Sequence, residues 1–341
     1  MKTIRNKTGL LILVLLMPSL STARVQVVTT LTDYAWAARA IAGDLAEVSS
    51  ILPPEQDAHT LAPRPSYALK LSRADLFVAT GLDLEIWVPA LLRRAGNASV
   101  RPGAPGYVRA ADGVPMLNVP TSADRSGGDV HVQGNPHIHT SPVNMRFVLR
   151  NISAGLGRVD PTNAGTYTAS AERVIKDLDE RLFGPELVAA MGGDLAARLA
   201  ARGRLFDLLK EREWEGRPMS ALLGGWLGRL QKAQGAPVAS YHLNWAYLIR
   251  LTGLRLVTVA EPKPGLPPTP GHVARMLQTV QQESVKVLLA ARHFPPDSVA
   301  AVCEKTGLTA LRLPFHTGSE GVSSYPALVE RWVQVLEQTL P

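Results

Sequence analysis

The segment VQVVTTLTDYAWAARAIAGDLAEVSSIL, residues 25–52, decides the fold class. Its first six residues are rich in β-branched side chains and predict a strand. Residues 33–41 then show a helical pattern, with Thr32 or Asp33 as a plausible N-cap, and residues 47–52 predict a second strand. A strand, a helix and a strand in this order are typical of a parallel βαβ unit. We therefore expect an α/β protein built on parallel sheets.

The alternation continues and then recurs in the last third of the chain. A strand is predicted at 75–80, between helices at 66–74 and 84–94. A mature chain of about 320 residues exceeds the size at which a single core usually splits. We therefore expect two α/β lobes, each a mainly parallel sheet flanked by helices. In the second lobe, strands are predicted at 237–241, 254–259, 285–290 and 309–313, with helices at 243–251, 272–283, 298–306 and 325–340.

Two segments of different character separate these regions. Residues 96–141 are rich in Gly, Pro, Ser and Asp and predict a long surface excursion. Residues 142–182 have helical spacing, and 184–210 predict more helix, interrupted at Gly192-Gly193. Such a helical block suits a rigid connector. We assign residues 24–141 to an N-terminal lobe, 142–234 to a connecting helix with a helical insertion, and 235–341 to a C-terminal lobe.

The N-terminus has the features of a cleavable signal peptide, which we place at residues 1–23. Basic residues precede an apolar run at 10–17, and small residues at 21–23 suit a signal peptidase. The run is well short of the ~20 apolar residues that a membrane span needs. The mature chain would begin at Arg24, which is not a cysteine that could carry lipid. These features predict a protein of the periplasm.

Charge and cysteine content limit the other functions. The formal charge of +7 falls to +4 when the three basic residues of the signal peptide are removed. No run of five basic residues occurs, so we expect no nucleic-acid partner. Cys303 is the only cysteine, so the chain has no internal disulfide and must depend on its core for stability.

Three histidines in different thirds of the chain are candidate metal ligands: His59, His137 and His242. Each follows a strand-like or turn-rich stretch. In an open parallel sheet, ligands bind outside the carboxyl ends of the strands. Imidazole is a good zinc ligand, and three protein ligands with one further group complete a tetrahedron.

Other histidines are alternatives. His139 is two residues beyond His137, and both would share a face if the segment were extended. His131 is expected to be a solvated loop residue that could assist in capturing metal. His316 follows a predicted strand and is a further candidate. We expect His293 to lie near the cleft without ligating, and His272 to lie on the surface.

Acidic residues could complete the coordination sphere. Glu261 follows a predicted strand and precedes a proline-rich turn that would hold its carboxylate in place, although such loops are usually solvated. Glu320 and Asp57 are weaker candidates. Asp57 could instead accept a hydrogen bond that orients an imidazole.

Five segments in order carry a resemblance to a known family. They are QDAHTLAPRPS at 56–66, ADLFVATGL at 74–82, GNPHIH at 134–139, YHLNW at 241–245 and EPKPGLPP at 261–268. Together they resemble the zinc/manganese class (cluster A-I) of periplasmic solute-binding proteins of ABC transporters. The resemblance covers nearly all of the mature chain.

The resemblance implies two α/β lobes joined by one long rigid helix, with a metal ion in the cleft between them. It places the family's first three ligands on His59, His137 and His242. The family's usual acid in the last loop has no counterpart in register, since this chain has FHTGS at 315–319. Glu261 is our tentative fourth ligand, and His316, Glu320 or water are alternatives.

The resulting hypothesis is a monomeric receptor, not an enzyme, that delivers a divalent ion to an inner-membrane ABC permease. Three nitrogen ligands favour Zn²⁺, with Mn²⁺ or Fe²⁺ as alternative cargo. Two other functions compete with this one. The same fold could serve a metal-stabilised adhesin, and three histidines could hold a catalytic zinc. The sequence lacks the HExxH motif of many zinc hydrolases.

Overall fold

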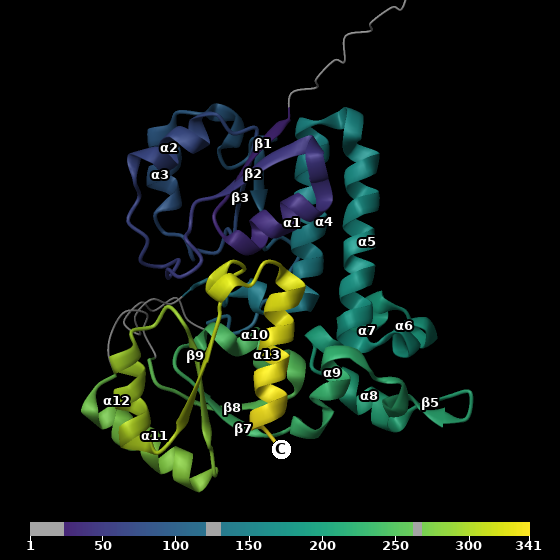
Figure 1. Ribbon diagram of the computed structural model, residues 1–341, viewed down its shortest axis with the longest axis vertical. Helices are drawn as coiled ribbons and strands as arrows, with labels where there is room; N and C mark the ends of the chain where they lie inside the picture. Colours follow the sequence, from purple (N-terminus) through teal and green to yellow (C-terminus); the bar gives the residue numbers. More distant parts are fainter. Residues whose placement is uncertain (1–23, 121–130, 262–267) are drawn as a thin grey trace, which may run out of the picture.

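Two α/β lobes are stacked along the long axis of the protein, beside a pair of long helices (Figure 1). The computed structural model describes residues 24–120, 131–261 and 268–341. The predicted signal peptide at 1–23 lies outside these residues. The prediction of two parallel-sheet lobes is confirmed. Among the described residues, no helix combines the length and the apolar character needed to cross a membrane.

The first lobe contains a four-stranded sheet in the order β2-β1-β3-β4, with every neighbouring pair parallel. Strand β3 is buried along its whole length, as expected for a sheet covered on both faces. The strands are β1 Val25–Thr29, β2 Ala46–Ser50, β3 Leu76–Ala79 and β4 Tyr107–Arg109, and the helices are α1 Thr32–Ala42, α2 Pro65–Ser72 and α3 Val88–Ala95.

The second lobe repeats this design with the strand order β10-β9-β7-β8, again all parallel. Its core includes Trp245 and Trp332, whose rings meet edge to face with centroids 5.4 Å apart. The strands are β7 Pro237–Ser240, β8 Arg255–Val259, β9 Val287–Ala291 and β10 Thr309–Leu313, and the helices are α10 Ala246–Thr252, α11 Pro270–Gln282, α12 Pro296–Thr306 and α13 Tyr325–Thr339.

The expectation of a continuous surface excursion over 96–141 is wrong for its first part. Strand β4 lies in this segment and pairs with β3. The short apolar bursts are core positions, because Val100, Val108 and Val114 are all buried. A three-residue strand among glycines and prolines has too little periodicity to be recognised from sequence.

The helical block after the first lobe is a hairpin of two helices, α4 Pro142–Val159 and α5 Ala164–Phe183. The chain turns at Asp160, whose φ of −135° and ψ of 75° leave the helical region. The following Pro161 explains this turn, because proline disfavours helical backbone at the residue before it. Helix α4 packs on the first sheet, while α5 extends toward the second lobe (Figure 1).

A helical insertion lies beyond α5. Its first two helices are separated at Gly192, whose φ of 78° ends α6, as the glycine pair predicts. Arg146 of α4 forms a buried ion pair with Asp179 of α5 and a second pair with Asp194 of α7. The elements are α6 Pro185–Met191, α7 Gly193–Ala201, α8 Leu205–Glu211, the antiparallel pair β5 Glu213–Trp214 and β6 Arg217–Pro218, and α9 Gly225–Arg229.

Close packing of α4 on the first sheet gives a stability prediction. A Cβ atom at Gly155 would lie 2.3 Å from Val108 Cγ2, so Gly155→Ala should reduce the free energy of unfolding by about 1–3 kcal/mol through overpacking. Gly165→Ala is the control, because a Cβ atom there has no neighbour within 4 Å. It should be neutral or stabilising by up to about 1 kcal/mol. Urea unfolding that gives equal values for both variants would contradict this packing.

Candidate metal centre

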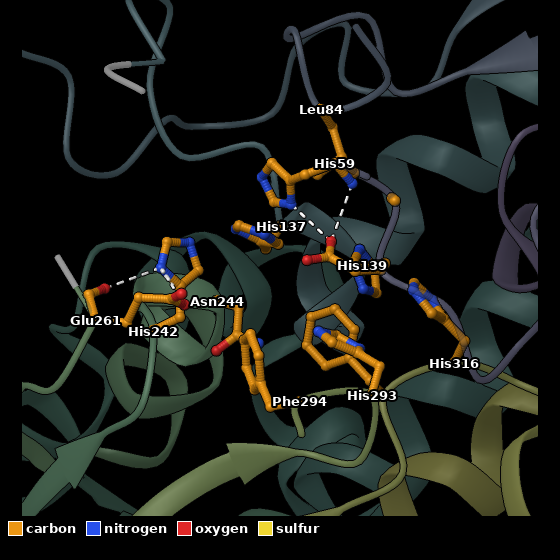
Figure 2. Close-up of a pocket in the computed structure, with 13 residues that line it drawn as sticks. His59, Leu84, His137, His139, His242, Asn244, Glu261, His293, Phe294 and His316 are labelled. Atoms are coloured by element: carbon orange, nitrogen blue, oxygen red, sulfur yellow. Dashed lines mark hydrogen bonds and ion pairs between the residues drawn. The ribbon is translucent and has the colours of Figure 1, made fainter. Parts of the chain in front are cut away.

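The carboxyl ends of strands from both lobes border a small cavity of about 10 Å³ (Figure 2). In the second lobe, the end of each strand is followed within a few residues by a side chain that lines the cavity. This is the edge of a parallel sheet at which ligands are expected. The lining of the second lobe includes His242 after β7, Glu261 after β8, His293 after β9 and His316 after β10.

The structure brings His59, His137 and His242 together in this cavity. One potential ligand atom from each lies within 4.8 Å of the other two. Their ring centroids are 5.2–5.9 Å apart. Imidazole nitrogens bound at ~2.0–2.1 Å to one tetrahedral ion are about 3.4 Å apart. A contraction of about 1 Å would therefore bring the three rings onto a single ion.

Each of these rings is oriented by an oxygen atom beside its Nδ1. A ring that donates from Nδ1 keeps the lone pair of Nε2 for a metal ion. Among the described residues, Nε2 of His242 is buried without a hydrogen-bond partner. The acceptors are Asp57 Oδ1 for His59 at 2.8 Å, Asn135 Oδ1 for His137 at 2.9 Å, and the backbone oxygen of Glu261 for His242 at 3.1 Å.

Burial keeps the imidazoles of His137 and His242 in the neutral form that binds metal. Burial, followed by repulsion from His59 and His242, lowers the pKa of His137 well below its usual value. Burial also lowers the pKa of His242 to about 4. Burial opposes the charge of Asp57, yet its hydrogen bond to His59 and the attraction between the two groups hold its pKa well below the usual range. The centre therefore contains two neutral rings, His137 and His242, and an ionised acceptor, Asp57.

The carboxylates of Glu261 and Glu320, the alternative oxygen ligands, lie away from the point where the three imidazoles converge. The Glu261 carboxylate is buried, but its Oε2 is 3.9 Å from Nδ1 of His242, on the side of the ring away from Nε2. Glu320 forms a 2.8 Å ion pair with Arg292 and is not part of the cavity lining. These contacts place neither carboxylate among the three converging nitrogens.

The remaining histidines lie in four different settings. His131 places its Nε2 3.4 Å from Nε2 of His59, so it reaches the centre rather than lying in a solvated loop. His272 is held at the start of α11 by a 2.7 Å hydrogen bond to Val259 O. His293 lines the cavity between aromatic rings. His139 and His316 belong to a separate cluster.

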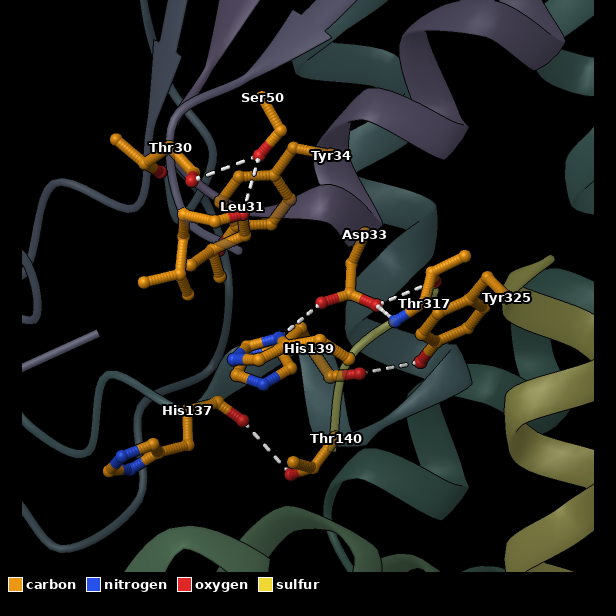
Figure 3. A network of polar contacts seen from close by, with 12 residues as sticks. Thr30, Leu31, Asp33, Tyr34, Ser50, His137, His139, Thr140, Thr317 and Tyr325 are labelled. Atoms are coloured by element: carbon orange, nitrogen blue, oxygen red, sulfur yellow. Dashed lines mark hydrogen bonds and ion pairs between the residues drawn. The ribbon is translucent and has the colours of Figure 1, made fainter. Parts of the chain in front are cut away.

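That cluster joins His139 and His316 to Asp33, a residue whose part in it the sequence did not reveal. Figure 3 shows Asp33 and His139. The prediction that Asp33 could be the N-cap of α1 is wrong. The N-cap is Leu31, without a side-chain cap bond. The Asp33 carboxylate instead accepts hydrogen bonds from His316 Nδ1 and from Thr317. Only the approach of the second lobe makes this contact possible.

The sequence matches the family described as "Zinc-uptake complex component A periplasmic" over residues 27–181 and 221–339. The chain belongs to this family. The match omits residues 182–220, which contain α6, α7, α8 and the β5–β6 pair. These elements form most of the insertion predicted between the connecting helix and the second lobe.

Individual relatives and solved structures agree with this assignment. The iron-binding protein YfeA of Yersinia pestis is 33% identical over 168 residues, covering 48% of this chain and 50% of that protein. The zinc-uptake protein ZnuA of Bacillus subtilis is 22% identical over 269 residues, covering 78% and 70%. The alignment with YfeA spans about half the length of that protein. Among solved structures, the solute-binding protein FpvC of Pseudomonas aeruginosa with Mn²⁺ superposes with a TM-score of 0.67 and 23% identity, covering 93% of this chain and 98% of that one.

The buried imidazoles give a pH prediction for the metal-free protein. Burial lowers the pKa of His139 and of His293 to about 3. Below pH 6.5 the unfolded chain binds protons that the folded chain excludes, so the free energy of unfolding should fall as pH falls toward 4. Each such ring contributes up to about 1.4 kcal/mol per pH unit.

The His293→Gln variant isolates one of these contributions. The free energy of unfolding, measured with urea between pH 6 and 4.5, should fall less steeply with falling pH than in the wild type. The difference in slope should be about 1 kcal/mol per pH unit. Val299→Ala changes the core without removing a titratable group, so it should shift stability equally at each pH. A slope in His293→Gln equal to that of the wild type would contradict the neutral state of this ring.

Proposed function

We propose that this protein is a periplasmic receptor that binds a divalent metal ion, foremost Zn²⁺, at His59, His137 and His242. The observation that carries the proposal is the convergence of three imidazoles whose Nδ1 atoms face fixed oxygen acceptors. Nitrogen ligands favour Zn²⁺ over Mn²⁺, which prefers oxygen. Fe²⁺ is the second candidate cargo.

The role in transport rests on family membership. The matching family is described as a periplasmic component of a zinc-uptake complex, and the matched relatives include proteins named for zinc and for iron. We infer that the chain is exported through its signal peptide and delivers its ion to an ABC permease in the inner membrane. It would act as a monomer, carrying the ion as cargo without catalysing a reaction.

We infer that His131 supplies the fourth ligand and that Glu261 orients His242. Two nitrogens bound to one tetrahedral ion at ~2.0–2.1 Å are about 3.4 Å apart. His131 Nε2 and His59 Nε2 lie 3.4 Å apart. Glu261 instead presents its backbone oxygen to His242 Nδ1 at 3.1 Å, with its carboxylate on the same side.

Two other functions predict different behaviour. A zinc hydrolase needs a general base beside the metal-bound water, whereas the Glu261 carboxylate faces the Nδ1 side of His242. The zinc-loaded protein should therefore leave ester and peptide substrates intact. An adhesin stabilised by a structural metal should unfold when the metal is removed. A receptor should release its ion to a mild chelator and keep its circular dichroism spectrum.

Variants of the three histidines test the binding site. Calorimetric titration of the stripped protein with Zn²⁺ should show a tight event that is weakened at least tenfold in His59→Ala, His137→Ala and His242→Ala, because each loses a ligand. His272→Ala is the matched control, since its ring lies at the start of α11 and outside the cavity lining. Unchanged affinity in all three ligand variants would overturn the assignment.

The same titration separates the two candidates for the fourth position. His131→Ala should lower the Zn²⁺ affinity more than Glu261→Gln, because the first change removes a ligand and the second keeps the backbone oxygen beside His242. The opposite order would restore Glu261 as the fourth ligand.

Uptake by the native bacterium tests delivery. A strain lacking this protein should accumulate less radioactive zinc at limiting external concentration, and the wild-type gene should restore uptake while His137→Ala should not. Parallel uptake of manganese and iron identifies the cargo. Equal zinc uptake with and without the protein would contradict zinc delivery.

A further inference from the structure

A second group of metal-ligating side chains lies beside the first. It consists of Asp33, His139 and His316, whose potential ligand atoms all lie within 4.8 Å of one another. All three side chains are essentially inaccessible to solvent, with relative exposures of 0–1%. The rings of His139 and His316 stack with centroids 4.8 Å apart and an interplanar angle of 22°.

Asp33 and His139 come from two separate parts of the fold (Figure 3), and His316 comes from a third. Asp33 lies in the first turn of α1, His139 lies in a short 3₁₀ helix at Ile138–Thr140 before α4, and His316 lies in the loop after β10. The contact between Asp33 and His316 therefore joins the two lobes. Its Oδ2–Nδ1 distance is 2.6 Å.

The Asp33 carboxylate is fixed in position and ionised. Its Oδ1 accepts hydrogen bonds from the backbone nitrogen and hydroxyl of Thr317 at 2.9 and 2.7 Å, which directs Oδ2 toward the imidazoles. Burial opposes its charge, but attraction and hydrogen bonding from His316 keep its pKa below the usual value. An anionic oxygen thus faces two rings in a closed interior.

Some ring nitrogens of His139 and His316 make no hydrogen bond within the described structure. Neither nitrogen of His139 has a hydrogen-bond partner, and Nε2 of His316 has none among the described residues. A buried polar atom without a partner costs about 1–3 kcal/mol, so native proteins seldom contain several together. A ligand that accepts electron pairs from these nitrogens would satisfy them.

We propose that Asp33, His139 and His316 form a second metal site, distinct from the site at His59, His137 and His242. In this site Nε2 of His316 and a nitrogen of His139 would bind a divalent transition ion such as Zn²⁺ or Fe²⁺, and Asp33 would orient His316 through its Nδ1, as Asp57 orients His59. His139 and His316 line the same cavity as His59, His137 and His242.

The position of this site predicts its effect on the lobes. An ion held by His139 from the first lobe and by His316 from the second would link the lobes directly. It would add to the existing contact between Tyr325 of α13 and the backbone of His139, where the hydroxyl donates at 2.7 Å. We infer that occupancy of this site favours the closed arrangement of the lobes.

Zinc stoichiometry tests the proposal. The stripped wild-type protein, dialysed against excess Zn²⁺ and analysed by mass spectrometry of the metal, should hold two ions per chain. His139→Phe preserves an aromatic ring but removes both nitrogens, so it should hold one. His293→Phe is the matched control from the same cavity lining and should still hold two.

A triple variant separates this proposal from the proposed function. His59→Ala combined with His137→Ala and His242→Ala should lose the first site and keep one ion. A triple variant that retains two ions would overturn the first site alone. A wild-type protein that saturates at one ion, or a folded His139→Phe protein that still holds two, would overturn the second site.

Crystallography of the wild-type protein avoids dependence on the folding of a variant. Crystals grown with saturating Zn²⁺ should show two anomalous peaks at the zinc absorption edge, one of them among Asp33, His139 and His316. A single peak among His59, His137 and His242 would overturn the second site. Both measurements use Zn²⁺ alone.

Discussion

The candidate centre depends on one requirement: each converging ring donates from Nδ1 to a fixed acceptor, which leaves Nε2 for a metal ion. Each of the three converging rings meets this requirement by a different means. Asp57 provides a carboxylate, Asn135 an amide oxygen and Glu261 a backbone oxygen. The cavity excludes most water, so these acceptors rather than solvent determine which nitrogen carries the proton.

Asn135 shows how this constraint is tied to the arrangement of the lobes. Its Oδ1 lies beside Nδ1 of His137, while its Nδ2 donates to Leu243 O at 2.7 Å in the second lobe. Its backbone oxygen also accepts a hydrogen bond from the Tyr247 hydroxyl at 2.8 Å. A movement of one lobe against the other would therefore disturb the orientation of a candidate ligand. Short, direct contacts of Asn135 thus connect the orientation of His137 to the position of the second lobe.

Much of the fold could be predicted because its signals are local. The segment 25–52 contains its βαβ pattern within one run of residues, and β3 is a short apolar run closed by Gly81. Strand β4 could not be predicted, because its three residues are stabilised by pairing with β3 rather than by their own periodicity. The turn at Asp160 could have been anticipated from Pro161, yet the helical spacing on both sides resembled one continuous block.

The sequence by itself determined the α/β class and the motifs that single out His59, His137 and His242. Only the tertiary structure decided how the other polar groups are used. It placed Asp33 against His316 across 283 residues of chain, and it placed His131 beside His59. The physical reason is that strand and helix signals arise between near neighbours in the chain. The partner of a buried charge or imidazole is set by how two separately folded sheets meet at their carboxyl ends.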